Sequence, residues 1–210
     1  MAQSVHHGGM MTLSAVCVYC GSNSGASPLY LQAATALGRA LAHADISLVY
    51  GGGSVGLMGA VAQAALEANG HVVGIIPDFL KSREVMLQNV SDLIVTETMH
   101  ERKHVMFEKA DAFVALPGGI GTLEEVVEQM TWSQLGQHAK PIVLLNINGF
   151  WDPLITLLEH MRSERFINPE RDVAFTVVER AEDVVTAIRH AITPLEPGEL
   201  AGASQTIEQM

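Results

Sequence analysis

The segment Ala112-Phe113-Val114-Ala115-Leu116-Pro117-Gly118-Gly119-Ile120-Gly121-Thr122-Leu123-Glu124-Glu125 joins an apolar run to a glycine turn and then to a helical pattern. A short apolar run that ends in proline and glycine is typical of a strand buried in a sheet. A second segment has the same plan, because Ser47-Leu48-Val49-Tyr50 leads into Gly51-Gly52-Gly53-Ser54-Val55-Gly56 and a further helical pattern. Strand, glycine turn and helix in this order form the unit of a parallel α/β sheet.

The same alternation continues along the chain on both sides of these segments. Short runs rich in β-branched residues predict strands at residues 15–20, 47–50, 72–76, 93–96, 112–116, 142–146 and 175–178. Longer patterns between them predict helices at residues 29–44, 57–69, 101–110, 123–135, 153–162 and 182–192. Most of the strands are apolar on both faces, as in a sheet covered by helices on each side. We therefore expect an α/β fold, a three-layer sandwich around a central, mostly parallel sheet of about seven strands.

Length and composition indicate one domain and exclude several kinds of partner. A chain of 210 residues with 48% hydrophobic content can bury one substantial core, so we expect a single domain at 12–193 between flexible tails at 1–11 and 194–210. The net charge of -11 opposes binding to nucleic acid. The sequence shows neither a membrane-spanning run nor a secretory signal, and Cys17 and Cys20 are too few for a disulfide scaffold. We expect a cytoplasmic protein without a membrane partner.

Both glycine turns are candidate ligand sites, because glycine lets the backbone approach an oxyanion closely. The helix after each turn presents free N–H groups that favour a negative charge. Candidates to bind phosphate or ribose are therefore Gly52 and Gly53 in the first turn and Gly118, Gly119 and Gly121 in the second. Tight turning explains a single turn equally well, but two of them on one sheet favour a nucleotide-binding domain.

The first turn also fits the G-x-G-x-x-G pattern of dinucleotide-dependent oxidoreductases, through Gly51, Gly53 and Gly56. Such a turn normally follows the first strand. An acidic residue that binds the ribose then occurs about 20 residues later, at the end of the next strand. Here it follows the second strand, and the nearest candidate acid, Asp78, comes after Pro77. An oxidoreductase is therefore the weaker hypothesis, and the missing Lys-Ser/Thr pair of a Walker motif disfavours ATP hydrolysis.

The second turn leads into residues that suit chemistry on a nucleotide. Thr122 is placed to cap the helix or contact a ligand, and we expect Glu124 and Glu125 in the first turn, where the helix dipole favours the ionised carboxylate. Capping alone would explain a first-turn glutamate. Beside a bound ribose, an ionised carboxylate would stabilise the cation-like transition state of N-glycoside cleavage, or attack the anomeric carbon. The segment Met99-His100-Glu101-Arg102-Lys103-His104 supplies two cations for a phosphate or for that carboxylate.

Residues 117–125 match the P-G-G-x-G-T-x-x-E motif of the cytokinin riboside 5′-monophosphate phosphoribohydrolases, the "Lonely Guy" proteins once labelled lysine decarboxylases. Residues 99–103 resemble the upstream arginine segment of that family, and the likeness spans residues 15–178. The resemblance implies a Rossmann-like fold, a homodimer, and hydrolysis of N6-prenylated adenosine 5′-monophosphates to free base and ribose 5-phosphate. It also implies that Arg102 and Glu125 are the catalytic pair and that Glu84 touches the ribose. By the same resemblance the nucleotide site is lined by Lys103, Gly119, Gly121, Thr122 and Thr131.

Ser22, just after the first strand, and Met99 are further candidates for substrate contact, although core packing is the commoner role of a methionine. We expect no cofactor and no metal. His100 and His104 spell H-E-x-x-H with Glu101, but two cations lie inside this motif and no third ligand follows at a zincin-like spacing. Cys17 and Cys20 spell C-x-x-C within a strand, where residues three apart point to opposite faces.

The main alternative function is a non-catalytic nucleotide carrier or sensor on the same fold. It predicts tight binding of a nucleotide without release of the base. Both hypotheses require a small phosphorylated ligand at the glycine turns, which local backbone amides can hold in an acidic protein.

Overall fold

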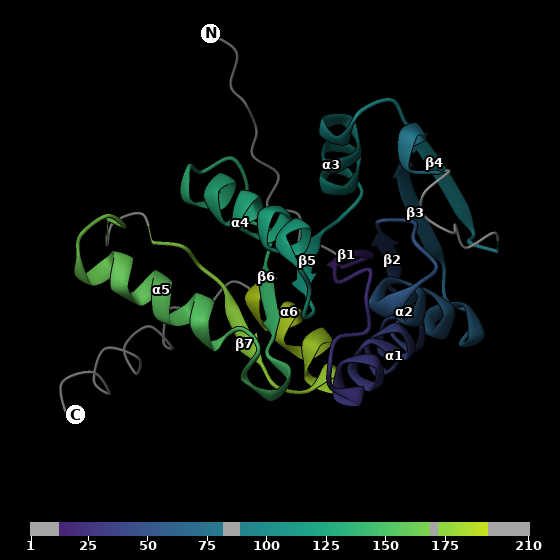
Figure 1. Ribbon diagram of the computed structural model, residues 1–210, viewed down its shortest axis with the longest axis horizontal. Helices are drawn as coiled ribbons and strands as arrows, with labels where there is room; N and C mark the ends of the chain where they lie inside the picture. Colours follow the sequence, from purple (N-terminus) through teal and green to yellow (C-terminus); the bar gives the residue numbers. More distant parts are fainter. Residues whose placement is uncertain (1–12, 82–88, 169–171, 193–210) are drawn as a thin grey trace, which may run out of the picture.

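Seven strands form one sheet in the order β4-β3-β2-β1-β5-β6-β7 (Figure 1). All six pairings between neighbouring strands are parallel. The computed structural model describes residues 13–81, 89–168 and 172–192. The tails expected at 1–11 and 194–210, and Glu84, lie outside the described residues.

The strands are β1 (Ala15–Tyr19), β2 (Ser47–Tyr50), β3 (Val72–Pro77), β4 (Asp92–Thr96), β5 (Ala112–Ala115), β6 (Ile142–Leu145) and β7 (Thr176–Val178). All seven expected strands are confirmed. Most strands are buried on both faces, as expected, whereas β4 leaves Leu93 and Val95 exposed. This strand lies at the edge of the sheet and pairs with β3 alone.

The helices are α1 (Pro28–His43), α2 (Gly56–Glu67), α3 (Met99–Glu108), α4 (Ile120–Gln134), α5 (Asp152–Ser163) and α6 (Val184–Ile192). Short 3-10 turns occur at η1 (Asp78–Leu80), η2 (Ile147–Gly149) and η4 (Ala181–Asp183). The six expected helices are confirmed. Helix α1 shows how local sequence sets a boundary, because the Ser27 hydroxyl caps it and Pro28 occupies its first position.

Helices cover both faces of the sheet, which confirms the three-layer sandwich (Figure 1). Side chains of α1, α2 and α6 pack on one face, and side chains of α3, α4 and α5 pack on the other. The strands alternate between the two cores, so Val16 and Val18 join the first and Cys17 and Tyr19 join the second. Cys20 returns to the first core, and the predicted opposite orientation of the two cysteines is confirmed.

The connections after β1 and β5 diverge, which locates the candidate site. These two strands are neighbours at the centre of the sheet, and the chain leaves β1 toward α1 on one face but leaves β5 toward α4 on the other. The amide of Gly21 donates a hydrogen bond to the carbonyl of Pro117 at 3.0 Å, so the two loops touch at the carboxyl edge. Ligands of parallel α/β sheets bind at such a topological switch point.

Candidate active site

Arg102 and Glu125 form a buried ion pair at the carboxyl edge of the sheet. Arg102 Nη1 donates a hydrogen bond of 2.6 Å to Glu125 Oε1, and Arg102 Nε donates one of 3.1 Å to the carbonyl of Ile75 in β3. Arg102 is 8% exposed and Glu125 is 9% exposed. Helices α3 and α4 thus bring together two residues that lie 23 positions apart in the sequence.

The first glycine turn makes room for this arginine. A Cβ atom built on Gly51 would collide with Arg102 Nη2 and would lie 3.1 Å from Met58 Sδ. Gly52 has a φ of +80°, a conformation that favours glycine over other residues. The turn after β2 therefore lies behind the guanidinium, as a surface against which Arg102 packs.

Burial and Arg102 have opposite effects on the protonation of Glu125. Burial raises the pKa of Glu125 above its usual value, and the adjacent charge and hydrogen bond of Arg102 oppose that rise. The sequence predicted that the helix dipole keeps Glu125 ionised because Glu125 lies in the first turn of α4. This explanation is wrong, because α4 has no acidic residue in its first turn. Arg102 is the main group that favours the carboxylate, and the charge of Lys103 acts in the same direction.

Helix α4 begins at Ile120, earlier than the sequence predicts, and this corrects two expected roles. Its N-cap is Gly119, so Thr122 does not cap the helix but lies inside it, buried beside Gly118. Glu124 and Glu125 fall beyond the first turn. The apparent capping sequence T-x-x-E misplaced the start of the helix.

The first turn of α4 faces open space, whereas the start of α2 does not. A Cβ atom built on Gly119 or Gly121 would meet nothing within 4 Å. At α2, the amides of Leu57 and Met58 donate to the carbonyl of Gly21 at 3.0 and 3.3 Å. Of these two turns, the one before α4 is therefore better placed to present amides to an anion.

A cavity of about 330 Å³, here called the dyad cavity, lies between α3, α4 and the loop after β1. This volume falls in the range of small-molecule sites, roughly 300–1,000 Å³. The cavity contains both members of the ion pair together with the predicted residues Ser22, Met99, Gly119, Gly121 and Thr122. The remaining lining residues are Cys20, Gly21, Met58, Leu80, Ile120 and Glu124.

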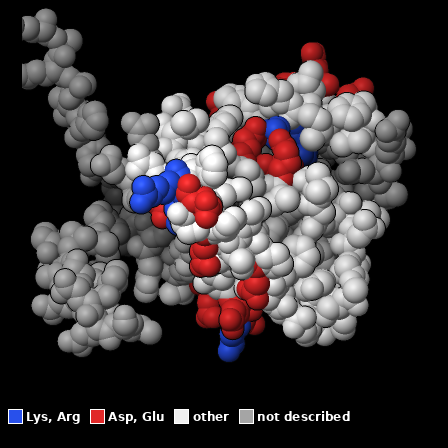
Figure 2. Space-filling model, turned by 60° about the vertical axis from the view of Figure 1, so that its left-hand side comes forward, with Lys and Arg blue, Asp and Glu red and all other residues white. Residues whose placement is uncertain are grey.

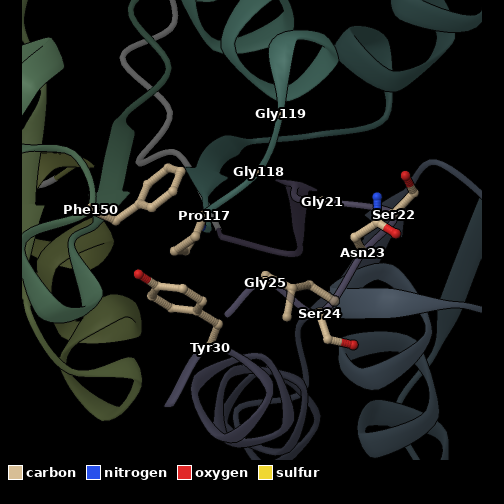
Figure 3. A pocket seen from close by; sticks show the side chains of 11 residues that line it. Gly21, Ser22, Asn23, Ser24, Gly25, Tyr30, Pro117, Gly118, Gly119 and Phe150 are labelled. Carbon is tan, nitrogen blue, oxygen red and sulfur yellow. The ribbon is translucent and has the colours of Figure 1, made fainter. Parts of the chain in front are cut away.

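A second cavity of about 270 Å³ adjoins the dyad cavity, and the two share Gly21, Ser22 and Gly119. Figure 3 shows aromatic side chains on one side of it and the loop after β1 on the other. The rings of Tyr30 and Phe150 meet edge to face, with centroids 5.8 Å apart. The remaining lining residues are Asn23, Ser24, Gly25, Leu57, Pro117 and Gly118.

Lys103 ties the two helices of the dyad together. Its Nζ donates to Glu124 Oε1 at 2.6 Å and to Glu128 Oε1 at 2.9 Å. Burial alone would lower the pKa of Lys103, but these two carboxylates raise it above its usual value. Among the described residues that line the two cavities, Lys103 does not occur.

Several other predicted contact residues lie outside both cavities. Gly52 and Gly53 are buried in the turn behind Arg102. Thr131 is exposed on α4, and its hydroxyl donates to the carbonyl of Val127 at 2.8 Å. Glu84 cannot be placed, because it lies outside the described residues.

No sequence pattern predicts the apolar walls of the two cavities. Leu80 and Ile120 in the dyad cavity, and Tyr30 and Phe150 in the second, are ordinary apolar residues of loops and helix ends. The sequence did contain a signal that Gly51 makes room for another group, because three consecutive glycines are more than a tight turn requires.

In the part of the chain that the structure describes, no group of three or more His, Cys, Asp and Glu side chains could hold a metal ion. In the H-E-x-x-H segment, His104 Nε2 instead lies 3.3 Å from Glu108 Oε1 on the same helix. Cys17 and Cys20 are buried free thiols, and burial raises the pKa of both.

Comparison with solved structures identifies the same fold in known proteins. A molybdenum cofactor binding protein from Rippkaea orientalis matches with a TM-score of 0.65 and 25% identity, over 87% of this chain and 99% of that one. A Moco carrier protein from Chlamydomonas reinhardtii matches with a TM-score of 0.65 and 22% identity, over 86% and 98% of the two chains. Both support a Rossmann-like fold.

Comparison of sequences identifies the family. Residues 58–188 match the family model described as "possible lysine decarboxylase". A cytokinin riboside 5′-monophosphate phosphoribohydrolase of Arabidopsis thaliana, LOG5, is 43% identical over 92% of this chain and 85% of its own length. The enzyme LOG2 of the same plant is 50% identical over 73% of this chain and 72% of its own, and LOG of Oryza sativa is 44% identical over 87% and 76%. The chain therefore belongs to the cytokinin riboside 5′-monophosphate phosphoribohydrolase family.

Proposed function

We propose that this protein hydrolyses the N-glycosidic bond of N6-modified adenosine 5′-monophosphates, releasing the free base, an active cytokinin, and ribose 5-phosphate. The observation that carries the proposal is the buried Arg102–Glu125 pair in a cavity that also borders the open first turn of α4. One structure thus offers a carboxylate for a cationic sugar and backbone amides for its phosphate. Membership of the family supports the same reaction.

In the proposed complex the 5′-phosphate binds at the start of α4, on the backbone of Gly119, Gly121 and Thr122. The ribose then extends along the helix toward Glu125. As the bond from C1′ to the base nitrogen breaks, its electron pair leaves with the base and positive charge develops on the sugar. Glu125 stabilises that charge, and a water molecule completes the hydrolysis: its hydroxyl ends on C1′ and its proton neutralises the departing base.

Arg102 acts in this proposal through Glu125. It binds Oε1 and leaves Oε2 outside the ion pair, so one oxygen is fixed while the other can face the sugar. Its charge also favours the ionised carboxylate against the effect of burial. Lys103 supports the arrangement from outside the cavity, because it joins α3 to Glu124 and Glu128 of α4.

The test is chromatographic detection of free base from plain and N6-prenylated adenosine 5′-monophosphates and from the matching nucleosides. Glu125→Gln should lower kcat by about 10²- to 10³-fold or more, since it removes the charge that stabilises the transition state. Glu159→Gln, which changes an exposed carboxylate on α5 outside both cavities, is the matched control and should keep the turnover. Equal turnover in Glu125→Gln and the unmodified protein would refute the assignment.

A nucleotide carrier is the second candidate, because the structural relatives include molybdenum cofactor carrier proteins. It predicts that adenosine 5′-monophosphate binds without any release of base. The same chromatographic assay, combined with calorimetry to measure binding, separates the two functions.

We further propose a homodimer. Ile120, Val127 and Leu135 lie along one side of α4 and are 81%, 39% and 62% exposed. An exposed apolar row of this kind favours a protein interface over solvent. The row begins at the dyad cavity, which Ile120 also lines.

We propose a cytoplasmic location, supported by the two free thiols. None of the described helices combines the length and hydrophobicity that a bilayer span requires. Nucleic acid is a poor partner in this proposal, since Lys and Arg on the face in Figure 2 lie beside acidic groups and the net charge is -11.

A further inference from the structure

We propose that a second site, at the opposite edge of the sheet from the dyad, binds a small oxyanion with two negative charges, such as phosphate. The site is a cavity of about 500 Å³, here called the amino-edge cavity, where β6 and β7 begin and α4 and α5 end. Its lining residues are Ser133, His138, Ala139, Lys140, Pro141, Ile142, Arg162, Val173, Ala174, Phe175, Thr176 and Ala191.

The charge of this lining departs from that of the whole chain. The sequence has 12 basic and 23 acidic residues, yet the described residues that line the cavity include Lys140 and Arg162 and no carboxylate. The hydroxyls of Ser133 and Thr176 add hydrogen-bond donors. Lys140 is the main source of positive charge at this hollow, because Asp172 pairs with Arg162; the free N–H groups of Arg162 and the two hydroxyls add donors that suit an oxyanion.

Lys140 is half-buried and has donors to spare. Its Nζ donates one hydrogen bond of 2.7 Å to the carbonyl of Phe107 and lies 3.9 Å from the centroid of the Phe107 ring. An ammonium has three N–H donors, and the hydrogen bond to this carbonyl uses one of them. Burial lowers the pKa of Lys140, a desolvation cost that a bound anion would offset.

Arg162 is held in a fixed position at the same cavity. Its Nε donates to both carboxylate oxygens of Asp172, at 2.8 and 3.0 Å, and its Nη2 donates to the carbonyl of Val173. Nη1 takes part in none of these three bonds. The guanidinium is therefore oriented before a ligand arrives, which lowers the entropic cost of binding.

The cavity is connected to both helices of the dyad. Lys140 contacts the carbonyl of Phe107 in the last turn of α3, and His138 Nε2 lies 3.1 Å from the carbonyl of Gln129 in α4. Helix α3 carries Arg102 and helix α4 carries Glu125. An oxyanion that takes the spare donors of Lys140 would share this ammonium with the α3 carbonyl, so its effect should reach residues 107–110.

The experiment is a titration of the full-length protein with sodium phosphate, followed by ¹H–¹⁵N NMR at constant ionic strength set with chloride. Binding at the amino-edge cavity should shift the backbone amides within 139–142, where Pro141 has no amide proton, and within 174–176. These signals are separate from those of 119–122, where the substrate phosphate is proposed to bind, so the test does not depend on turnover. Succinate as a second titrant distinguishes a phosphate site from a general oxyanion site, and a response to either supports the proposal.

Lys140→Met should weaken the response at 139–142 and 174–176 by about tenfold or more, because a charge-assisted hydrogen bond is lost. Arg39→Gln, which removes an exposed cation from the other face of the sheet, should leave it unchanged. Absence of shifts at 139–142 and 174–176 in the unmodified protein would overturn the proposal, as would unchanged affinity in a folded Lys140→Met. If that variant does not fold, the pattern of shifted amides in the unmodified protein decides whether the proposal holds.

Discussion

Glu125 depends mainly on Arg102 to remain charged. Burial favours its neutral form, and Arg102 opposes that effect from 2.6 Å away. A buried carboxylate that loses its cation is left uncompensated, which in proteins is strongly unfavourable. The two residues therefore act as a unit, and the loss of either should affect the other.

Arg102→Gln should shift the acid limb of the kcat/KM–pH profile to higher pH. In the unmodified protein the limb follows ionisation of Glu125, whose pKa is raised by burial and held down by Arg102. Without the guanidinium the effect of burial loses its main opponent, so Glu125 is protonated at pH values where it was charged. Turnover measured from pH 4 to 9 tests this, and an acid limb at unchanged or lower pH contradicts it.

Gly51→Ala should lower both kcat and the free energy of unfolding. The added methyl group would collide with Arg102 Nη2, and a guanidinium that moves away leaves the buried Glu125 carboxylate without its ion-pair partner. That movement displaces it from Glu125 and should reduce turnover by about tenfold or more. Steady-state kinetics and thermal unfolding measure the two effects, and a large fall in Tm with unchanged kcat would show that Gly51 serves only the fold.

Helix α4 shows where sequence reasoning succeeds and where it fails. Its existence was predictable, because a buried strand, a glycine turn and a helical pattern follow one another. Its start was not, because Gly119 and Gly121 have low helix propensity and Thr122 with Glu125 imitates a capping box. The packing of Thr122 against Gly118 prevails over that local signal.

Gly121→Ala should stabilise the protein and weaken substrate binding. A methyl group at this position meets nothing within 4 Å, and alanine is favoured over glycine in a helix by about 0.5–1 kcal/mol. The same methyl group enters the dyad cavity. A higher free energy of unfolding together with a raised KM is expected. Gly38→Ala is the contrast, because its Cβ would collide with the Val61 carbonyl and should destabilise the protein. A KM unchanged by Gly121→Ala would place the phosphate elsewhere.

The fold of the whole molecule places residues from distant parts of the sequence next to one another. The strand order and the three layers follow from alternating patterns and could be predicted. The pairing of Arg102 with Glu125 came from a resemblance, because no local rule places residues of two helices side by side. The orientation of Lys103 toward α4, and the aromatic wall of Tyr30 and Phe150, depend on three-dimensional packing and had no signal in the sequence.

The exposed row on α4 predicts the assembly. If Ile120, Val127 and Leu135 form the centre of a dimer, Val127→Glu places a charge in a desolvated interface and should shift the equilibrium to monomer. Analytical ultracentrifugation measures the mass against 22.5 kDa for one chain. Arg39→Gln on α1 is the control. A monomeric unmodified protein, or a Val127→Glu variant that stays dimeric, would rule out this interface.

A crystal structure of Glu125→Gln with adenosine 5′-monophosphate would show directly whether the carboxylate and the start of α4 serve one ligand. We expect the phosphate on the amides of 119–122 and C1′ within about 4 Å of the side chain at position 125, the reach of a direct contact. A nucleotide whose phosphate lies away from this turn, or whose C1′ is out of contact with position 125, would contradict the proposed mechanism.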